Sequence, residues 1–100
     1  MIRAVVDKRR AVVTGHAGYA ACGSDIVCAA VSILVYVQVR LLERAGALEA
    51  LHSRSGYVAM TLQPDCGMRP EVLALGLKWL AREYPDCVQL EDKGVMDLAP

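Results

Sequence analysis

Residues 15–32 of the chain read GHAGYAACGSDIVCAAVS, and they join a glycine-rich stretch to a run of apolar residues. Glycine restricts the backbone least, so the three glycines at the start of this segment predict a mobile loop over Gly15–Gly23. Ser24 and Asp25 follow as residues that favour the N-cap of a helix, and Gly46 offers the matching stop. The segment therefore predicts a helix that begins directly after the loop.

The apolar run Ile26–Val39 is nevertheless compatible with two structures. Aliphatic residues alternate with other side chains along its second half, as in a strand, whereas Cys28, Ser32 and Tyr36 recur every four residues, as on a helix. The distance between the two caps is long for a strand, so length favours a helix. The run is shorter than the roughly 20 apolar residues of a membrane span and contains Gln38, so we expect a buried element and no membrane insertion.

Short strands and a second helix are expected on either side of this segment. The expected elements are a hairpin of strands 2–6 and 11–14 around a polar turn, a second hairpin of strands 50–53 and 57–62 around a turn at 54–56, a helix from Pro70 to about Tyr84, and a strand over 88–90, followed by a frayed tail. Trp79 is expected to pack on the second helix. The order β-β-α-β-β-α-β predicts an α/β sandwich, with two helices on a mixed, largely antiparallel sheet.

The composition limits the classes of function. A chain of 100 residues and 10.8 kDa, 55% hydrophobic and 22% charged, predicts one ordered domain over residues 1–100, without room for a separate cofactor domain. Eleven Lys and Arg balance eleven Asp and Glu, and this lack of a basic excess argues against direct nucleic-acid binding. The N-terminus lacks the pattern of a secretory signal, so we expect a cytoplasmic protein whose cysteines are reduced.

The four cysteines do not form a recognisable metal-binding pattern. Cys22 and Cys28 are separated by five residues and Cys66 and Cys87 by twenty, whereas structural zinc sites usually use close pairs. We therefore expect no metal. Cys66 and Cys87 are expected to be packing or surface residues, and Cys22 a simple thiol of the loop, with a regulatory disulfide as the alternative.

His16 and Cys28 could form a nucleophilic pair. His16 follows a predicted strand, and Cys28 lies in the first turn of the predicted helix. A helix N-terminus stabilises a thiolate through its exposed N–H groups, and a neighbouring imidazole can accept the thiol proton. Free cysteine is also among the most buried residue types, and a cysteine near a helix start is usually a packing residue. The two residues alone leave both interpretations open.

The same segment resembles the ribosomal-processing cysteine protease family, called Prp. The eleven residues between His16 and Cys28 match the dyad spacing of that family. The other matching positions are Gly15 and Ala17 beside the histidine, Gly23, the run Asp25–Ser32 and, more weakly, Leu75-Gly76-Leu77 and Glu83-Tyr84-Pro85. Since the family has a helix after its catalytic cysteine, the resemblance favours a helix after Cys28.

The resemblance implies a bacterial, cytoplasmic cysteine endopeptidase that needs no cofactor. Family members remove a short N-terminal extension from a protein of the large ribosomal subunit. By matching position, Cys28 would be the nucleophile and His16 the general base. Family structures are homodimers whose loop between the dyad residues is mobile until peptide binds, so we expect a homodimer here.

Five further residues are expected to support the dyad or contact the substrate. Gly15 and Gly23 bound the mobile loop, and Tyr19 would help to cover the bound peptide. Asp25 would cap the helix, or else orient the imidazole or contact substrate, and Ser32 would hydrogen-bond near the thiol or to the helix backbone. Backbone N–H groups at the start of the helix would stabilise the oxyanion.

Two other classes of function remain as alternatives. The first is a non-catalytic, ribosome-associated binding protein that keeps the fold, and the presence of both His16 and Cys28 counts against it. The second is a thiol redox protein that uses Cys22 and Cys28, and their spacing differs from the C-x-x-C pattern of such proteins.

Overall fold

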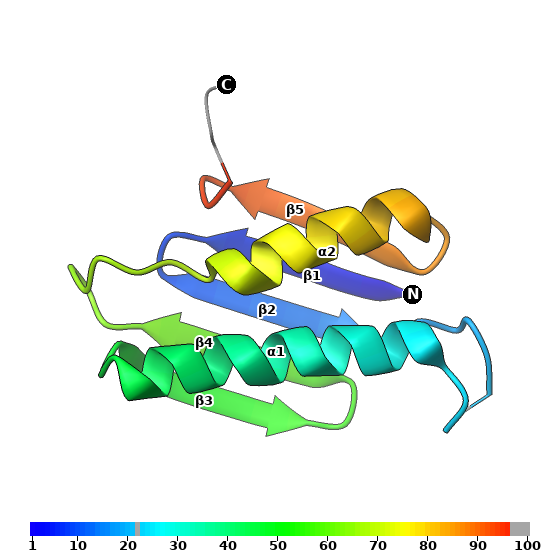
Figure 1. The fold of residues 1–100 in the computed structure, drawn as a ribbon, viewed down its shortest axis with the longest axis horizontal. Helices are drawn as coiled ribbons and strands as arrows, with labels where there is room; N and C mark the ends of the chain where they lie inside the picture. Colours follow the sequence, from blue (N-terminus) through cyan, green and yellow to red (C-terminus); the bar gives the residue numbers. More distant parts are fainter. Residues whose placement is uncertain (22, 97–100) are drawn as a thin grey trace.

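Five strands and two helices follow one another along residues 1–21 and 23–96, the part of the chain that this computed structural model describes (Figure 1). The elements are β1 (Ile2–Asp7), β2 (Arg10–Gly15), α1 (Ile26–Arg44), β3 (Leu48–Arg54), β4 (Tyr57–Leu62), α2 (Glu71–Glu83) and β5 (Val88–Lys93). This is the expected order. Most boundaries differ by one or two residues, and three differences bear on the fold: β3 begins at Leu48, Pro70 is the N-cap and not part of α2, and β5 continues to Lys93, where a frayed tail was expected.

The strands form one mixed sheet in the order β3-β4-β2-β1-β5. Neighbouring strands are antiparallel except β1 and β5, which run parallel. Ile2 in β1 lies opposite Gly15 in β2 on one side and opposite Val88 in β5 on the other. Because α2 separates β4 from β5 along the chain, it provides the crossover that a parallel strand needs. The predicted mixed, largely antiparallel sheet is confirmed.

Both helices lie on the same face of the sheet, as Figure 1 shows, and the core fills the space between the two layers. In β1, the alternate residues Ile2, Ala4 and Val6 are at most 2% exposed, which is the period expected of a strand with one buried face. They share one hydrophobic cluster with Leu42 of α1 and Leu77 of α2, both fully buried.

The ambiguous apolar run forms a helix of 19 residues, α1. Its buried positions are Val27, Val31, Gln38, Val39 and Leu42, which recur at helical spacing along one stripe. By length and composition alone α1 could cross a membrane, but its buried stripe packs against the sheet.

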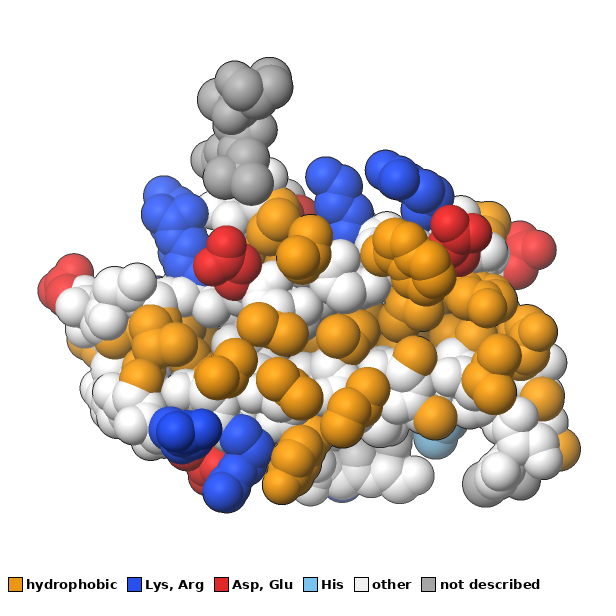
Figure 2. Space-filling model, in the orientation of Figure 1, with side chains coloured by type: hydrophobic (Ala, Val, Ile, Leu, Met, Phe, Trp, Pro, Cys, Tyr) orange, Lys and Arg blue, Asp and Glu red, His pale blue; other side chains and the backbone are white. Residues whose placement is uncertain are grey.

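The outward side of the helix layer carries a band of apolar side chains (Figure 2). Ile33 of α1 is 55% exposed, and Leu75 and Trp79 of α2 are each 57% exposed. Trp79, which was expected to pack on the second helix, has more than half of its surface exposed on this side. These residues border an apolar groove of about 560 Å³ between α1 and α2, and Gly76 forms part of its lining.

Candidate active site

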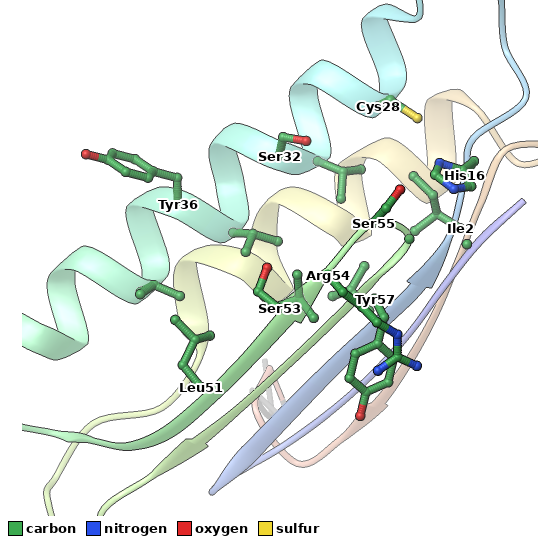
Figure 3. Close-up of a pocket in the computed structure, with 17 residues that line it drawn as sticks. Ile2, His16, Cys28, Ser32, Tyr36, Leu51, Ser53, Arg54, Ser55 and Tyr57 are labelled. Atoms are coloured by element: carbon green, nitrogen blue, oxygen red, sulfur yellow. The ribbon is translucent and has the colours of Figure 1, made fainter. Parts of the chain in front are cut away.

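His16 and Cys28 both line one end of a pocket between α1 and the β3–β4 hairpin (Figure 3). His16 directly follows β2, and Cys28 is the third residue of α1. Figure 3 shows the Cys28 sulfur directed toward the side on which the imidazole lies. Cys28 is partly buried and His16 is exposed, so a substrate can reach both side chains.

The Asp25 carboxylate joins the start of α1 to the preceding loop. Its Oδ1 accepts hydrogen bonds from the backbone N–H groups of Val27 (3.0 Å) and Cys28 (2.9 Å), which makes Asp25 the N-cap of α1. Its Oδ2 accepts the N–H groups of Tyr19 (2.9 Å) and Ala20 (3.3 Å). The Cys28 N–H is the largest of the influences that hold the pKa of this carboxyl below its ordinary value.

This arrangement limits two of the roles considered for Asp25 and the helix. Among the described residues, the hydrogen bonds of Asp25 go to backbone N–H groups and none reaches His16. The N–H of Cys28, a candidate donor to an oxyanion, is already bound to the carboxylate. Asp25 therefore acts here as a link between loop and helix.

The loop also contacts the thiol. The backbone N–H of Ala17 donates to the Cys28 Sγ at 3.3 Å, and the Ala17 side chain is 3% exposed, so this part of the loop is anchored in the core. A donor at this position can stabilise negative charge on the sulfur or on an oxygen bound next to it. Ser32 lies one turn further along α1, is exposed and lines the same pocket.

The pocket has a volume of about 460 Å³ and extends along α1 away from the dyad. One wall consists of α1 residues from Cys28 to Val39, a rise of about 17 Å at ~1.5 Å per residue. That length matches about five residues of an extended peptide at ~3.3 Å each. Leu51, Ser53 and Ser55 on β3 and its turn form the opposite wall, and Figure 3 shows Ser53 and Ser55 pointing into the pocket.

The structure divides the seven predicted site residues into two groups. His16, Cys28, Gly15 and Ser32 line the pocket, whereas Tyr19, Gly23 and Asp25 do not. The ring of Tyr19 packs edge-on against the ring of Tyr84 just after α2, with 5.5 Å between centroids. In this conformation Tyr19 therefore does not cover the pocket.

Cys66 and Cys87 do not line the pocket. Cys22 falls outside the described residues. Cys87 is buried in the core, and the Cys66 thiol donates to the Met68 carbonyl at 3.7 Å. Over residues 1–21 and 23–96, no group of three His, Cys, Asp or Glu side chains is placed to hold a metal ion.

Sequence reasoning missed the wall formed by the β3–β4 hairpin. Ser53 and Ser55 come from a segment that carries no recognisable motif. The one local signal is that positions 51, 53 and 55 share a face at the two-residue period of a strand. That period does not reveal which helix faces them.

Comparisons with known proteins agree on one family. A family model described as cysteine protease Prp matches residues 1–89. The ribosomal processing cysteine protease Prp of Mycoplasma pneumoniae is 30% identical over 96 residues, covering 93% of this chain and 96% of the relative.

Two solved structures share the architecture. The crystal structure of SMU.848 from Streptococcus mutans has a TM-score of 0.73 at 29% identity, covering 94% of this chain and 95% of that one. The second is the crystal structure of the ribosomal processing protease Prp from S. aureus in complex with a covalently linked product peptide. Its TM-score is 0.77 at 19% identity, and the match covers 92% of this chain and 97% of that one. The second likeness concerns the fold alone.

Proposed function

The chain belongs to the Prp family of cysteine proteases, and from this membership we propose that it is a cytoplasmic, single-domain endopeptidase in which Cys28 is the nucleophile and His16 the general base. The observation that carries the assignment is the placement of both side chains at one end of a pocket long enough for about five extended residues. The N–H of Ala17 at the Cys28 sulfur adds a donor where negative charge develops.

The proposed reaction has two steps. His16 accepts the thiol proton, and the Cys28 sulfur attacks the scissile carbonyl to form a tetrahedral intermediate. The C–N bond then breaks, His16 protonates the leaving amine, and a thioester remains on the sulfur. A water molecule, deprotonated by His16, hydrolyses the thioester and regenerates the thiol. We assign the Ala17 N–H as an oxyanion donor, because it lies next to the sulfur and is not engaged by Asp25.

The proposed substrate is the N-terminal extension of a large-subunit ribosomal protein precursor. Support comes from family membership and from the M. pneumoniae relative, whose name describes ribosomal processing. The pocket wall away from the dyad is apolar, with Val35, Val39 and Leu51, so apolar side chains of an extension would bind there. A chain without net charge is suited to acting on the protein and not on RNA.

Substitution of the dyad tests this function. Cys28→Ala and His16→Ala should each abolish cleavage of the extended precursor, measured by mass spectrometry, while circular dichroism stays that of the parent. His52→Ala is the matched control, since His52 lies in β3 and does not line the pocket. Cleavage at the parent rate by either dyad variant would refute the assignment. A parent protein that binds the precursor without cutting it would favour the non-catalytic alternative.

We further propose that the protein is a homodimer that pairs through the outward side of α1 and α2. Exposed Ile33, Leu75 and Trp79 line the apolar groove at Gly76. A twofold interface joins the same patch on both subunits, so one contiguous apolar patch is sufficient to form it. Apolar side chains gathered on one face are also typical of interaction surfaces (Figure 2).

Light scattering after size exclusion tests the dimer. The parent should have twice the chain mass of 10.8 kDa, and Trp79→Lys should shift it to the monomer. Val5→Lys is the control, because Val5 is also an exposed apolar residue, 40% exposed, but lies on the sheet. A monomeric parent, or equal behaviour of the two variants, would contradict this interface.

A further inference from the structure

In the described part of the chain, His16 has no polar partner of the kind that usually orients a catalytic imidazole. Among residues 1–21 and 23–96, its side chain makes no hydrogen bond and no ion pair. Asp25, the acidic residue nearest in sequence on the C-terminal side, is engaged with four backbone N–H groups. In a nucleophile–base pair the base is generally oriented by a third group. Some other part of the fold must therefore restrict the ring of His16.

The turn between β3 and β4 packs against that ring. The N–H of Gly15 donates to the carbonyl of Gly56 at 2.9 Å, which ties the residue before His16 to the turn. A β carbon built on Gly56 would lie 2.9 Å from His16 Nε2, 3.5 Å from Cε1 and 3.6 Å from Cδ2. The imidazole thus occupies the space that any other side chain at position 56 would need.

We propose that Gly56 is the positioning residue of His16: its backbone anchors the start of the histidine segment, and its missing side chain provides the surface on which the imidazole rests. This inference rests on the proposed function, in which His16 is the general base. In other dyads and triads a polar side chain orients the imidazole through a hydrogen bond. Here a glycine would do so by leaving space in which the ring fits. The same turn carries Ser55, which lines the pocket, so substrate and base contact one hairpin.

The test compares Gly56→Ala with Gly67→Ala. Gly56 has a φ of 71° and Gly67 a φ of 75°, so an alanine is similarly strained at either site. At Gly67, however, a β carbon would meet no atom within 4 Å. The difference between the two variants therefore reports the contact with His16 and not the backbone strain. If Gly56→Ala is unfolded at the assay temperature, both are compared in trimethylamine N-oxide, which favours the folded state.

Two readouts are expected to separate the variants. Gly56→Ala should lower kcat for precursor cleavage by about 100-fold with KM nearly unchanged, because a catalytic group displaced by about 1 Å costs that much. Gly67→Ala should stay within about twofold of the parent. In NMR spectra the imidazole signals of His16 should shift in Gly56→Ala, and those of His52, the second of the two histidines, should not.

The proposal fails if Gly56→Ala keeps the kcat of Gly67→Ala, or if the His16 signals stay in place in a folded Gly56→Ala protein. The NMR readout needs no activity, so it is separate from the test of the proposed function. Retained cleavage by His16→Ala would overturn the catalytic assignment itself, whereas unmoved His16 signals would overturn only the role of Gly56.

Discussion

Gln38 offers a quantitative test of how the two helices are joined. It is a polar side chain within the core, 1% exposed, and its Oε1 accepts the backbone N–H of Leu73 at 3.0 Å. Leu73 lies in the first turn of α2, where N–H groups have no partner within the helix. The residue before α2 is Pro70, which provides no side-chain cap. A side chain of α1 therefore caps α2 from another part of the chain.

Replacing Gln38 with Leu or Met keeps most of the volume but removes the acceptor. The Leu73 N–H then stays buried without a partner, which costs about 1–3 kcal/mol. We expect a loss of about 2 kcal/mol in the free energy of unfolding. For a domain of this size that corresponds to a fall in Tm of roughly 8–16 °C. Agreement between Leu and Met would show that the missing oxygen, and not the shape, is responsible.

Urea unfolding followed by circular dichroism measures this loss. Gln63→Leu is the matched control, because Gln63 is exposed and its backbone N–H, which the substitution keeps, donates to the Ala47 carbonyl at 2.7 Å. That control should stay within about 0.5 kcal/mol of the parent. Gln38 does not line the pocket, so precursor cleavage at low temperature should be unchanged. If both Gln38 variants unfold like the control, the cap does not support α2 and the reasoning is wrong.

Three further outcomes are expected. Asp25→Asn keeps an oxygen that can cap α1 but turns an N–H donor toward Tyr19 and Ala20, so precursor cleavage should change while helix content does not. Asp25→Ser, which also caps, should have the same effect. Unchanged cleavage kinetics in both variants would show that the loop has no part in catalysis. Because the folded-state pKa of Asp25 is lowered, the stability that its ionised form adds over Asn is complete above pH ~5 and is lost as the pH falls below ~4. Urea unfolding of the parent and of Asp25→Asn at a series of pH values measures this difference. A difference in the free energy of unfolding that grows in acid would contradict the direction of the pKa shift. Glu49→Gln should change the free energy of unfolding by less than about 1 kcal/mol, since the Arg9–Glu49 pair is half exposed. A larger loss in urea unfolding would show that solvent does not screen this pair.

Local patterns predicted those features that neighbouring residues determine. Asp25 was expected as a helix cap because aspartate accepts N–H groups two and three residues ahead, and this is the geometry found. The apolar run was ambiguous by period, since β-branched residues occur in both structures, and length together with the resemblance favoured the helix that forms.

Contacts between distant segments could not be predicted in this way. Gly56 lies 40 residues from His16, and Leu73 lies 35 from Gln38, so no local period relates the partners. The exposure of Trp79 likewise depends on which faces of α1 and α2 meet the sheet, and no local pattern shows those faces. The site therefore needs the fold to bring its second wall, the hairpin, to the dyad.

The parallel pairing of β1 with β5 has a consequence for when the protein becomes functional. Ile2 and Val88 lie opposite each other although 86 positions separate them, so the outer edge of β1 stays uncovered until β5 has been made. Pairings of such large sequence separation form slowly, because the closure of a long loop comes before the contacts that stabilise it. An exposed edge of β1 in the meantime is a template for pairing with other chains. Newly made protease is therefore expected to complete its sheet only after β5 has been synthesised, and the time before that closure is when it is most prone to aggregate.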